Sequence, residues 1–214
     1  LPDLKRIPGV RAIERRLVLP GTVFLKDNSR MSGVLVFLET AQPTLDALGL
    51  VEGSPIRPQD FESAVMERSL AMFHGFRVGD RIRVQVGEKV YENRIDGTVV
   101  SPEYLITAAN PEYLVPERGS VGVVFTGLDR VSDSLGFTMV NDLLFRFEPG
   151  ADPRAVRETV LARLRRVNLE RVIPKEEHFI WRFVHVEMEA FKVYFPCVVL
   201  ILGILAFLLT VITM

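Results

Sequence analysis

The sequence predicts a mixed α and β domain that continues through a helix into a membrane. Residues 81–86 alternate polar and apolar side chains, which is the period of a half-buried strand. Val156, Val160 and Leu164 recur at helical spacing and predict an amphipathic helix. Residues 193–214 include no charged side chain. As a helix they would rise roughly 33 Å, enough to cross a hydrocarbon core of about 30 Å.

Length and charge limit the function classes. The 214 residues are enough for one or two domains. The 26 basic and 27 acidic side chains leave a formal charge of −1, which removes the electrostatic basis for nucleic-acid binding. Apolar residues make up 48% of the chain and charged residues 25%, so a wholly disordered chain is excluded as well.

The apolar run favours a membrane span over a buried core helix, because core helices rarely run so long without a polar face. Tyr194 and Pro196 lie at the expected membrane boundary, where proline bends the helix rather than ends it. Gly203 is expected to be a helix-packing position within the span. The chain starts at Leu1 with no recognisable signal peptide and stops in the apolar run, so we expect it to be cut from a longer protein.

Before the span, local patterns predict the elements in order. Residues 17–25 and 33–39 are rich in β-branched and aromatic side chains and flank the polar segment 26–30, which predicts a hairpin. Residues 44–50 look like a short helix. Residues 69–73 predict another short helix, within a mostly β middle region.

The last elements before the membrane are helical. Asp152 followed by Pro153 is typical of a helix start, with a capping carboxylate and a proline in the first turn. From Glu176, apolar residues again follow helical spacing and nothing breaks the pattern before Pro196. We therefore expect a helical stalk over 176–192 that leads directly into the span at 193–214.

A set of short motifs occurs in a familiar order along the chain. They are Ile7-Pro8-Gly9-Val10, Leu50-Val51-Glu52-Gly53, Met66-Glu67-Arg68-Ser69-Leu70-Ala71, Val78-Gly79-Asp80, Gly97-Thr98-Val99-Val100-Ser101-Pro102-Glu103-Tyr104, Asn141-Asp142 and Pro149-Gly150-Ala151-Asp152. In this order and spacing, and ending in an uncharged span, they resemble the large extracytoplasmic loop of an FtsX-like (MacB-type) ABC transporter permease with the transmembrane helix that follows it.

The resemblance implies a two-lobed α+β extracytoplasmic domain. Residues 1–50 and 136–175 would form a porter-like α+β lobe, and residues 51–135 an inserted, mostly β lobe. The implied localisation is the inner (plasma) membrane, with residues 1–192 on the extracytoplasmic side. The implied partners are a cytoplasmic ABC ATPase subunit, a second permease copy or half, the lipid bilayer and a periplasmic adaptor protein.

Catalytic and metal chemistry find little support in the sequence. His178 and His185 are seven residues apart, roughly 10.5 Å along a helix, which is too far to share a zinc ion. His74 is expected to end a helix. Neither a phosphate-binding P-loop nor a Gly-x-Ser-x-Gly nucleophile motif occurs, so we expect no cofactor, no metal and no enzyme activity in this chain. The single cysteine, Cys197, lies in the apolar run and is expected to pack there.

Two near-copies, Ser101-Pro102-Glu103-Tyr104-Leu105 and Asn110-Pro111-Glu112-Tyr113-Leu114, have two interpretations. Each starts a turn with its tyrosine packed beneath it. Alternatively, Tyr104 and Tyr113 lie on a protruding loop and contact a partner or an amphipathic substrate, since tyrosine is favoured at interfaces.

The sequence thus predicts a permease subunit of an ABC-type exporter or of a lipid- or lipoprotein-extracting transporter, which relays ATP-driven motion to the outer side. An extracytoplasmic sensor domain of a membrane receptor or kinase is the alternative, since its stalk would also lead into a membrane helix. A membrane-anchored hydrolase is disfavoured because no nucleophile constellation is recognisable.

Overall fold

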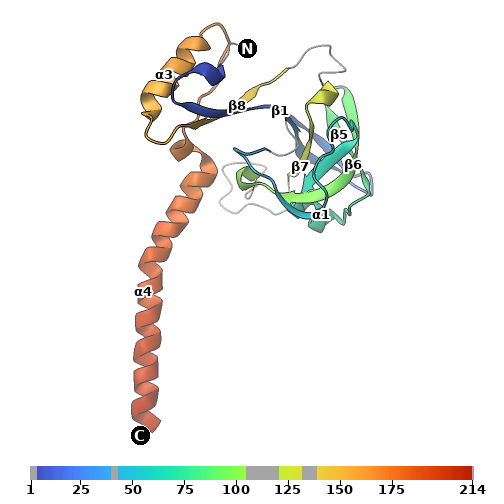
Figure 1. Cartoon of the computed structure of the whole chain (residues 1–214). Helices are drawn as coiled ribbons and strands as arrows, with labels where there is room; N and C mark the ends of the chain where they lie inside the picture. The colour runs from blue at the N-terminus through green and yellow to red at the C-terminus, as the bar shows by residue number, and fades with distance from the viewer. Residues whose placement is uncertain (1–3, 40–42, 105–120, 132–138, 214) are drawn as a thin grey trace. The chain divides into compact units, whose positions relative to one another are not determined.

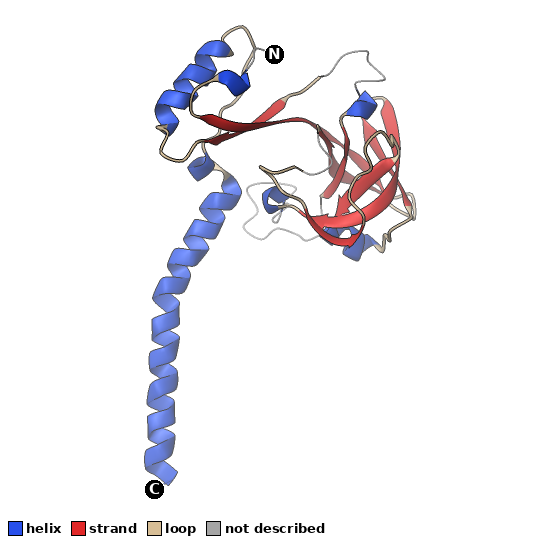
Figure 2. Cartoon of the chain, viewed as in Figure 1, coloured by secondary structure: helices blue, strands red, loops and turns tan. Residues whose placement is uncertain are grey.

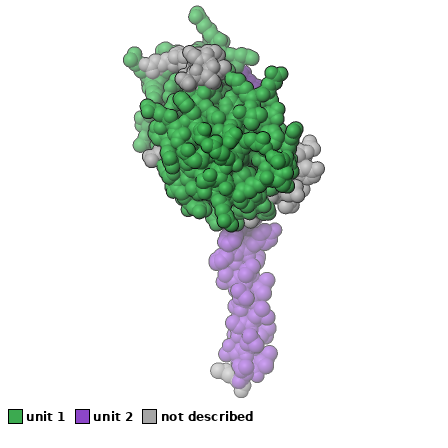
Figure 3. Space-filling model, turned by 90° about the vertical axis from the view of Figure 1, so that its right-hand side faces the viewer, with its two compact units in different colours: residues 1–168 green, residues 169–214 purple. Residues whose placement is uncertain are grey.

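The structure is a computed structural model that describes residues 4–39, 43–104, 121–131 and 139–213. The chain divides into two compact units, residues 1–168 and 169–214, which Figure 3 shows in different colours. The strands of the described residues all lie in the first unit, and the longest helix lies in the second.

Six strands of the first unit close into a barrel. They are β1 (Val10–Phe24), β2 (Arg30–Leu38), β4 (Ser63–Glu67), β5 (Arg81–Val86), β6 (Lys89–Val100) and β7 (Gly122–Gly127). Around the barrel the order is β1-β2-β7-β4-β6-β5, and β5 pairs again with β1. Figure 1 labels β1, β5, β6 and β7 among these strands, and Figure 2 draws the strands in red. The β2–β7 and β4–β6 pairs are parallel, and the other four pairs are antiparallel.

The predicted N-terminal hairpin is confirmed. β1 and β2 pair antiparallel from Arg16 opposite Leu38 to Phe24 opposite Arg30. The turn between them is held by the Asp27 carboxylate, which accepts hydrogen bonds from the backbone N–H and the hydroxyl of Ser29 at 2.9 and 2.6 Å. These local contacts set the register of the first two strands.

The barrel interior is filled with apolar side chains from every strand and from α1 (Arg68–His74), the short helix expected near 69–73. Leu35 and Phe37 of β2 point inward, and Val36 and Leu38 pack on the outer face with Val65, Val99 and Phe125. The alternation of burial along β2 therefore produces two apolar clusters, one on each side of the same strand.

The segment 43–48 is not a helix, so the helix expected over 44–50 is wrong. The backbone N–H groups of Thr44 and Leu45 donate to the Glu14 carboxylate. Gly49 and Leu50, at the end of the expected helix, pair with β6 and so have strand backbones. The chain then forms β3 (Gly49–Gly53), which pairs antiparallel with the end of β6.

A second layer lies on the N-terminal half of β1. β8 (Asp142–Phe147) pairs with β1 from Val10 to Arg16, and α3 (Pro153–Arg163) packs on these two strands. Val156 and Val160 of α3 are buried against the 3-10 turn η1 (Leu4–Arg6) and the strands. β1 is therefore shared, because its first half pairs with β8 and its second half belongs to the barrel (Figure 1).

The start of α3 is as predicted. Asp152 has an extended backbone and its carboxylate accepts a hydrogen bond from Arg154 N–H at 2.9 Å, with Pro153 in the first turn. We expect Asp152→Ala to lower the free energy of unfolding of the first unit by about 1 kcal/mol, because a helix N–H loses its acceptor. Asp152→Asn keeps an acceptor oxygen and should lower the free energy of unfolding by no more than a few tenths of the Asp152→Ala loss. Urea denaturation of the full chain in mild detergent compares the two; equal losses would contradict the capping role.

The second unit consists of residues 169–174, the 3-10 turn η3 (Lys175–Glu177) and α4 (Phe179–Thr213). α4 begins three residues later than expected because His178 has an extended backbone that separates η3 from the helix. It then continues through Pro196 without ending, as predicted. Among the described residues one segment, Trp181–Thr213, is long and apolar enough to cross a membrane, and none of its most apolar stretch is buried.

The α+β fold class with a long C-terminal apolar helix is therefore confirmed. The lobe bounds, 1–50 with 136–175 and 51–135, remain a prediction. The barrel itself draws β1 and β2 from the first of these ranges and β4 to β7 from the second.

Candidate functional site

A buried ion network surrounds Arg16 at the point where β1 changes partner. Arg16 is opposite Asp142 of β8 on one side and opposite Leu38 of β2 on the other. Only 2% of its surface is exposed, although arginine is rarely buried without charged partners.

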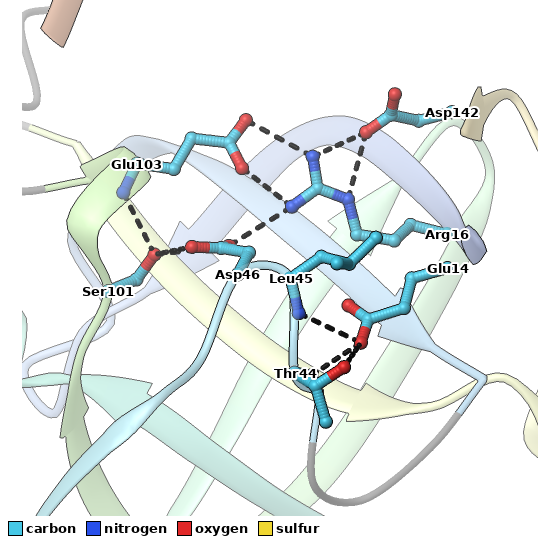
Figure 4. Close-up of polar contacts among 8 residues, drawn as sticks. All are labelled: Glu14, Arg16, Thr44, Leu45, Asp46, Ser101, Glu103 and Asp142. Carbon is cyan, nitrogen blue, oxygen red and sulfur yellow. Dashed lines mark hydrogen bonds and ion pairs between the residues drawn. The ribbon is translucent and has the colours of Figure 1, made fainter. Parts of the chain in front are cut away.

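Three carboxylates contact the Arg16 guanidinium (Figure 4). Glu103 of η2 (Pro102–Tyr104) binds it with both oxygens, at 2.6 Å to Nη1 and 3.2 Å to Nη2. Asp142 accepts from Nε at 2.8 Å and also from Nη2. Asp46, from the segment 43–48, accepts from Nη1 at 3.1 Å. The guanidinium thus ties together β1, β8, η2 and the segment before β3.

The buried side chain of Ser101 holds Asp46 and Glu103 in place. Ser101 Oγ lies 3.3 Å from both carboxylate oxygens of Asp46, to which it donates. The same hydroxyl accepts a hydrogen bond from Glu103 N–H at 3.3 Å. Ser101 therefore fixes the relative positions of Asp46 and Glu103, the two acidic groups on either side of Nη1 (Figure 4).

Glu14, two residues before Arg16 on the same face of β1, fixes the approach of the 43–48 segment. Its Oε1 accepts from Thr44 N–H, from the Thr44 hydroxyl at 2.9 Å and from Leu45 N–H at 3.0 Å. Arg146 of β8 donates to the Thr44 carbonyl oxygen at 2.9 Å. This second set of bonds holds Asp46 against Arg16.

The network has an excess of negative charge, because three carboxylates face one guanidinium. Burial disfavours the charge on Arg16, but the Glu103 and Asp142 carboxylates outweigh it and raise the pKa of the guanidinium above its ordinary value. Burial, and then the charge of Glu103, raise the pKa of Asp46 to about 6 against the opposing effects of Arg16 and Ser101. Asp46 is therefore the group in this network that gains or loses a proton near neutral pH.

The network can hold β1, β8, η2 and the segment before β3 in a fixed geometry. It can also bind a proton at Asp46. Arg16 and Asp46 are buried, and Asp142 and Glu103 keep 34% and 25% of their side chains exposed. Removal of Arg16 leaves three carboxylates without their cation, one of them, Asp46, in a buried site. The network is thus a junction between the barrel and the α3 layer.

Of the tyrosines predicted as an interaction loop, Tyr104 is partly buried and packs edge-on against Phe125, with 5.8 Å between ring centroids. Burial raises the pKa of its phenol above the ordinary value. This contact corresponds to the interpretation in which the tyrosine of the Ser-Pro-Glu-Tyr motif packs beneath the turn. Tyr113 lies outside the described residues, and contact of either tyrosine with a partner remains a prediction. Tyr194, Pro196 and Gly203 all lie within α4.

Within the described residues, no group of three or more His, Cys, Asp or Glu side chains could hold a metal ion. His74 is the last residue of α1, as expected, and His185 lies in α4. A surface hollow of about 460 Å³ is open and includes Lys26 and Arg83 in its lining. Lys26 pairs with Asp80 and Arg83 donates to Asn28, so these cations already have partners.

Sequence reasoning missed Arg16, Asp46 and Glu14. The available signal was their position, since Glu14 and Arg16 interrupt the apolar face of a strand that is otherwise rich in β-branched residues. Ser101, Glu103 and Asp142 did belong to recognised motifs, but nothing in those motifs paired them with Arg16.

With the barrel, the α3 layer and α4 described, comparison with solved structures defines the fold. No protein-family model matches the sequence, and no curated protein is similar to it in sequence. The periplasmic region of MacB from Actinobacillus actinomycetemcomitans aligns over 77% of this chain and 70% of that chain, with a TM-score of 0.51 and 10% identity. The chain has the MacB periplasmic fold.

A second similar structure is the extracellular domain of the noncanonic ABC-type transporter YknZ from Gram-positive bacteria. It covers 73% of both chains, with a TM-score of 0.48 and 13% identity, which is too loose to add to the assignment. The resemblance to MacB-type domains that the motif order predicted is thus confirmed at the level of fold.

Proposed function

We propose that this chain is the outer domain and one membrane span of the permease of an ABC-type transporter. One observation carries the proposal: a MacB-like periplasmic fold and a 35-residue helix with an uncharged C-terminal stretch occur in the same chain. In this proposal residues 1–192 lie outside the inner (plasma) membrane and residues 193–214 cross it.

In the proposed transporter this chain transmits movement and does not itself catalyse a reaction. The energy comes from ATP hydrolysis by a separate cytoplasmic ATPase subunit. A second permease copy or half completes the transmembrane part, and a periplasmic adaptor is a further proposed partner. Export, or extraction of a lipid or lipoprotein, is the proposed work of the outer domain.

The length of α4 supports mechanical relay. Its 35 residues rise roughly 52 Å, whereas the bilayer core needs about 30 Å. The charged first part, residues 179–192, therefore extends roughly 21 Å beyond the uncharged part. A continuous helix transmits displacement along its axis up to Phe179, where residues 169–178 and their single 3-10 turn join it to the first unit.

The test softens this stalk without changing its surroundings. In the full-length protein, assembled with its ATPase subunit in nanodiscs, we expect Glu187→Gly with Met188→Gly to uncouple the outer domain. Each glycine costs about 1 kcal/mol of helix propensity relative to alanine. ATP hydrolysis should stay within twofold of wild type, and the nucleotide-dependent change in hydrogen exchange of residues 1–168 should be lost.

The matched control is Glu187→Ala with Met188→Ala, which removes the same side chains and keeps the helix stiff. It should retain the nucleotide-dependent exchange. If the glycine variant assembles and still shows that change, relay through the stalk is wrong. If the wild-type protein shows no nucleotide-dependent change in complex with its ATPase, the proposed function itself fails.

A further inference from the structure

Five arginines lie on and just after α3, at positions 154, 157, 163, 165 and 166, and are called here the α3 arginine surface. Val156, Val160 and Leu164 face the core of the α3 layer. Four of the arginines are therefore exposed and Arg157 is half-buried, on the sides of the helix that turn away from the strands. The apolar side of α3 already has its partner, and the basic side faces solvent.

Several barrel arginines have acidic partners, which the described residues do not provide for the α3 arginine surface. Arg81 pairs with Glu62 and Glu92, and Arg94 pairs with Asp60 and Asp96. Within the described residues, none of the five side chains of the α3 arginine surface forms a salt bridge or a side-chain hydrogen bond. Like charges a turn apart repel one another, so the cluster is unfavourable to the isolated helix.

The charge is also divided unevenly along the chain. Residues 1–16 and 141–168 together have eleven basic and six acidic side chains, a net charge of +5. Residues 17–140 have eleven basic and sixteen acidic side chains, a net charge of −5. The overall charge of −1 therefore conceals an uneven distribution, although Arg15 and Arg16 are neutralised by carboxylates of the second range. A partner that fits the α3 arginine surface is anionic.

If α4 crosses a membrane that contains anionic lipids, their headgroups are an anionic surface to which α3 is tethered. Residues 169–178, between the two helices, include a single 3-10 turn and could extend to roughly 33 Å. The part of α4 outside the uncharged stretch rises roughly 21 Å, so the connection is long enough for α3 to return to the bilayer surface. Tethering raises the effective concentration of lipid headgroups at α3 to the millimolar range or above. Arginine binds phosphate oxygens with two parallel hydrogen bonds.

We propose that the α3 arginine surface binds the phosphate-bearing headgroups of anionic lipids in the leaflet from which α4 emerges. The proposal rests on the membrane placement of α4 in the proposed function, but not on transport. It gives the outer domain a salt-sensitive contact with the bilayer, in addition to its covalent connection to α4.

The experiment measures the approach of α3 to the lipid surface in the full chain. A fluorophore is attached at Ala162→Cys, an exposed α3 position, in a Cys197→Ser background, and the acceptor is a headgroup-labelled lipid in nanodiscs. We expect energy transfer to be at least twofold more efficient in discs with 30% phosphatidylglycerol than in neutral phosphatidylcholine discs. The difference should vanish in 0.5 M salt, because exposed charges are then screened.

Two variants that lose four positive charges each separate this surface from net charge. Arg154, Arg163, Arg165 and Arg166 are changed to glutamine in one, and exposed Arg30, Arg68, Arg77 and Lys89 of the barrel in the other. The first should lose the lipid dependence, and the second should keep it.

Two results would overturn the proposal: equal energy transfer in neutral and anionic discs, or the same loss of lipid dependence in both variants. Equal transfer in the two kinds of disc would point to an acidic protein as the partner instead. Failure of the chain to enter discs of either composition would instead contradict the membrane placement of α4.

Discussion

Replacing Arg16 with methionine is expected to destabilise the first unit by about 3–5 kcal/mol, the cost of breaking a buried ion network from one side. Methionine fills much of the same volume but leaves Asp46, Glu103 and Asp142 facing one another without a cation. The midpoint of urea denaturation of the full chain in mild detergent, followed by the loss of strand signal in circular dichroism, measures the change.

Arg81→Met is the matched control, because Arg81 also contacts two carboxylates but more than half of its side chain is exposed. Exposed pairs contribute about 0–1 kcal/mol, so this variant should stay close to wild type. Adding Asp46→Asn and Glu103→Gln to Arg16→Met should restore part of the loss, since two of the uncompensated charges are removed. If Arg16→Met costs no more than Arg81→Met, the network does not stabilise the junction.

Asp46→Asn is expected to change how stability depends on pH. The pKa of Asp46 is raised to about 6 in the folded protein, mainly by burial, against about 3.9 in an unfolded chain. Between about pH 4 and pH 6 the folded state therefore binds a proton that the unfolded state has lost, so the free energy of unfolding falls as pH rises through this window. Below and above the window Asp46 contributes no slope.

Asparagine cannot ionise, so the variant lacks this contribution. The unfolding free energy of wild type minus that of Asp46→Asn should fall by up to roughly 3 kcal/mol between pH 4 and pH 7. The subtraction removes the titrating groups that do not interact with Asp46. A flat difference for Asp46→Asn would show that folding does not raise the pKa of Asp46.

Elements governed by nearby residues were predictable from the sequence. The β1–β2 hairpin depends on the 26–30 turn, the start of α3 on Asp152, and β5 on strict alternation over six residues. In each case the deciding contacts lie within a few positions, so the local pattern contains the information. The continuation of α4 through Pro196 was predictable for the same reason.

The site was not predictable because its contacts are long-range. Arg16 meets Asp46, Glu103 and Asp142, which follow it by 30, 87 and 126 positions. The wrong helix over 44–50 has the same cause, since Gly49 and Leu50 pair with the distant residues Val100 and Val99. The pairing of β8 with β1 brings in Asp142, and the pairing of β3 with β6 brings Asp46 near Glu103. One sequence reveals neither pairing.

The parallel pairing of β2 with β7 delays completion of the barrel while the protein is being synthesised. β2 is complete at Leu38, but its second neighbour is complete only at Gly127, roughly ninety residues later. At about 5–20 residues per second, the edge of β2 stays without its partner for roughly 5–20 s while the chain emerges. Because the edge holds Leu35, Val36 and Phe37, it is a template for pairing with other chains during that interval. Conditions that slow synthesis between residues 38 and 127 should therefore favour aggregation of nascent chains over barrel closure.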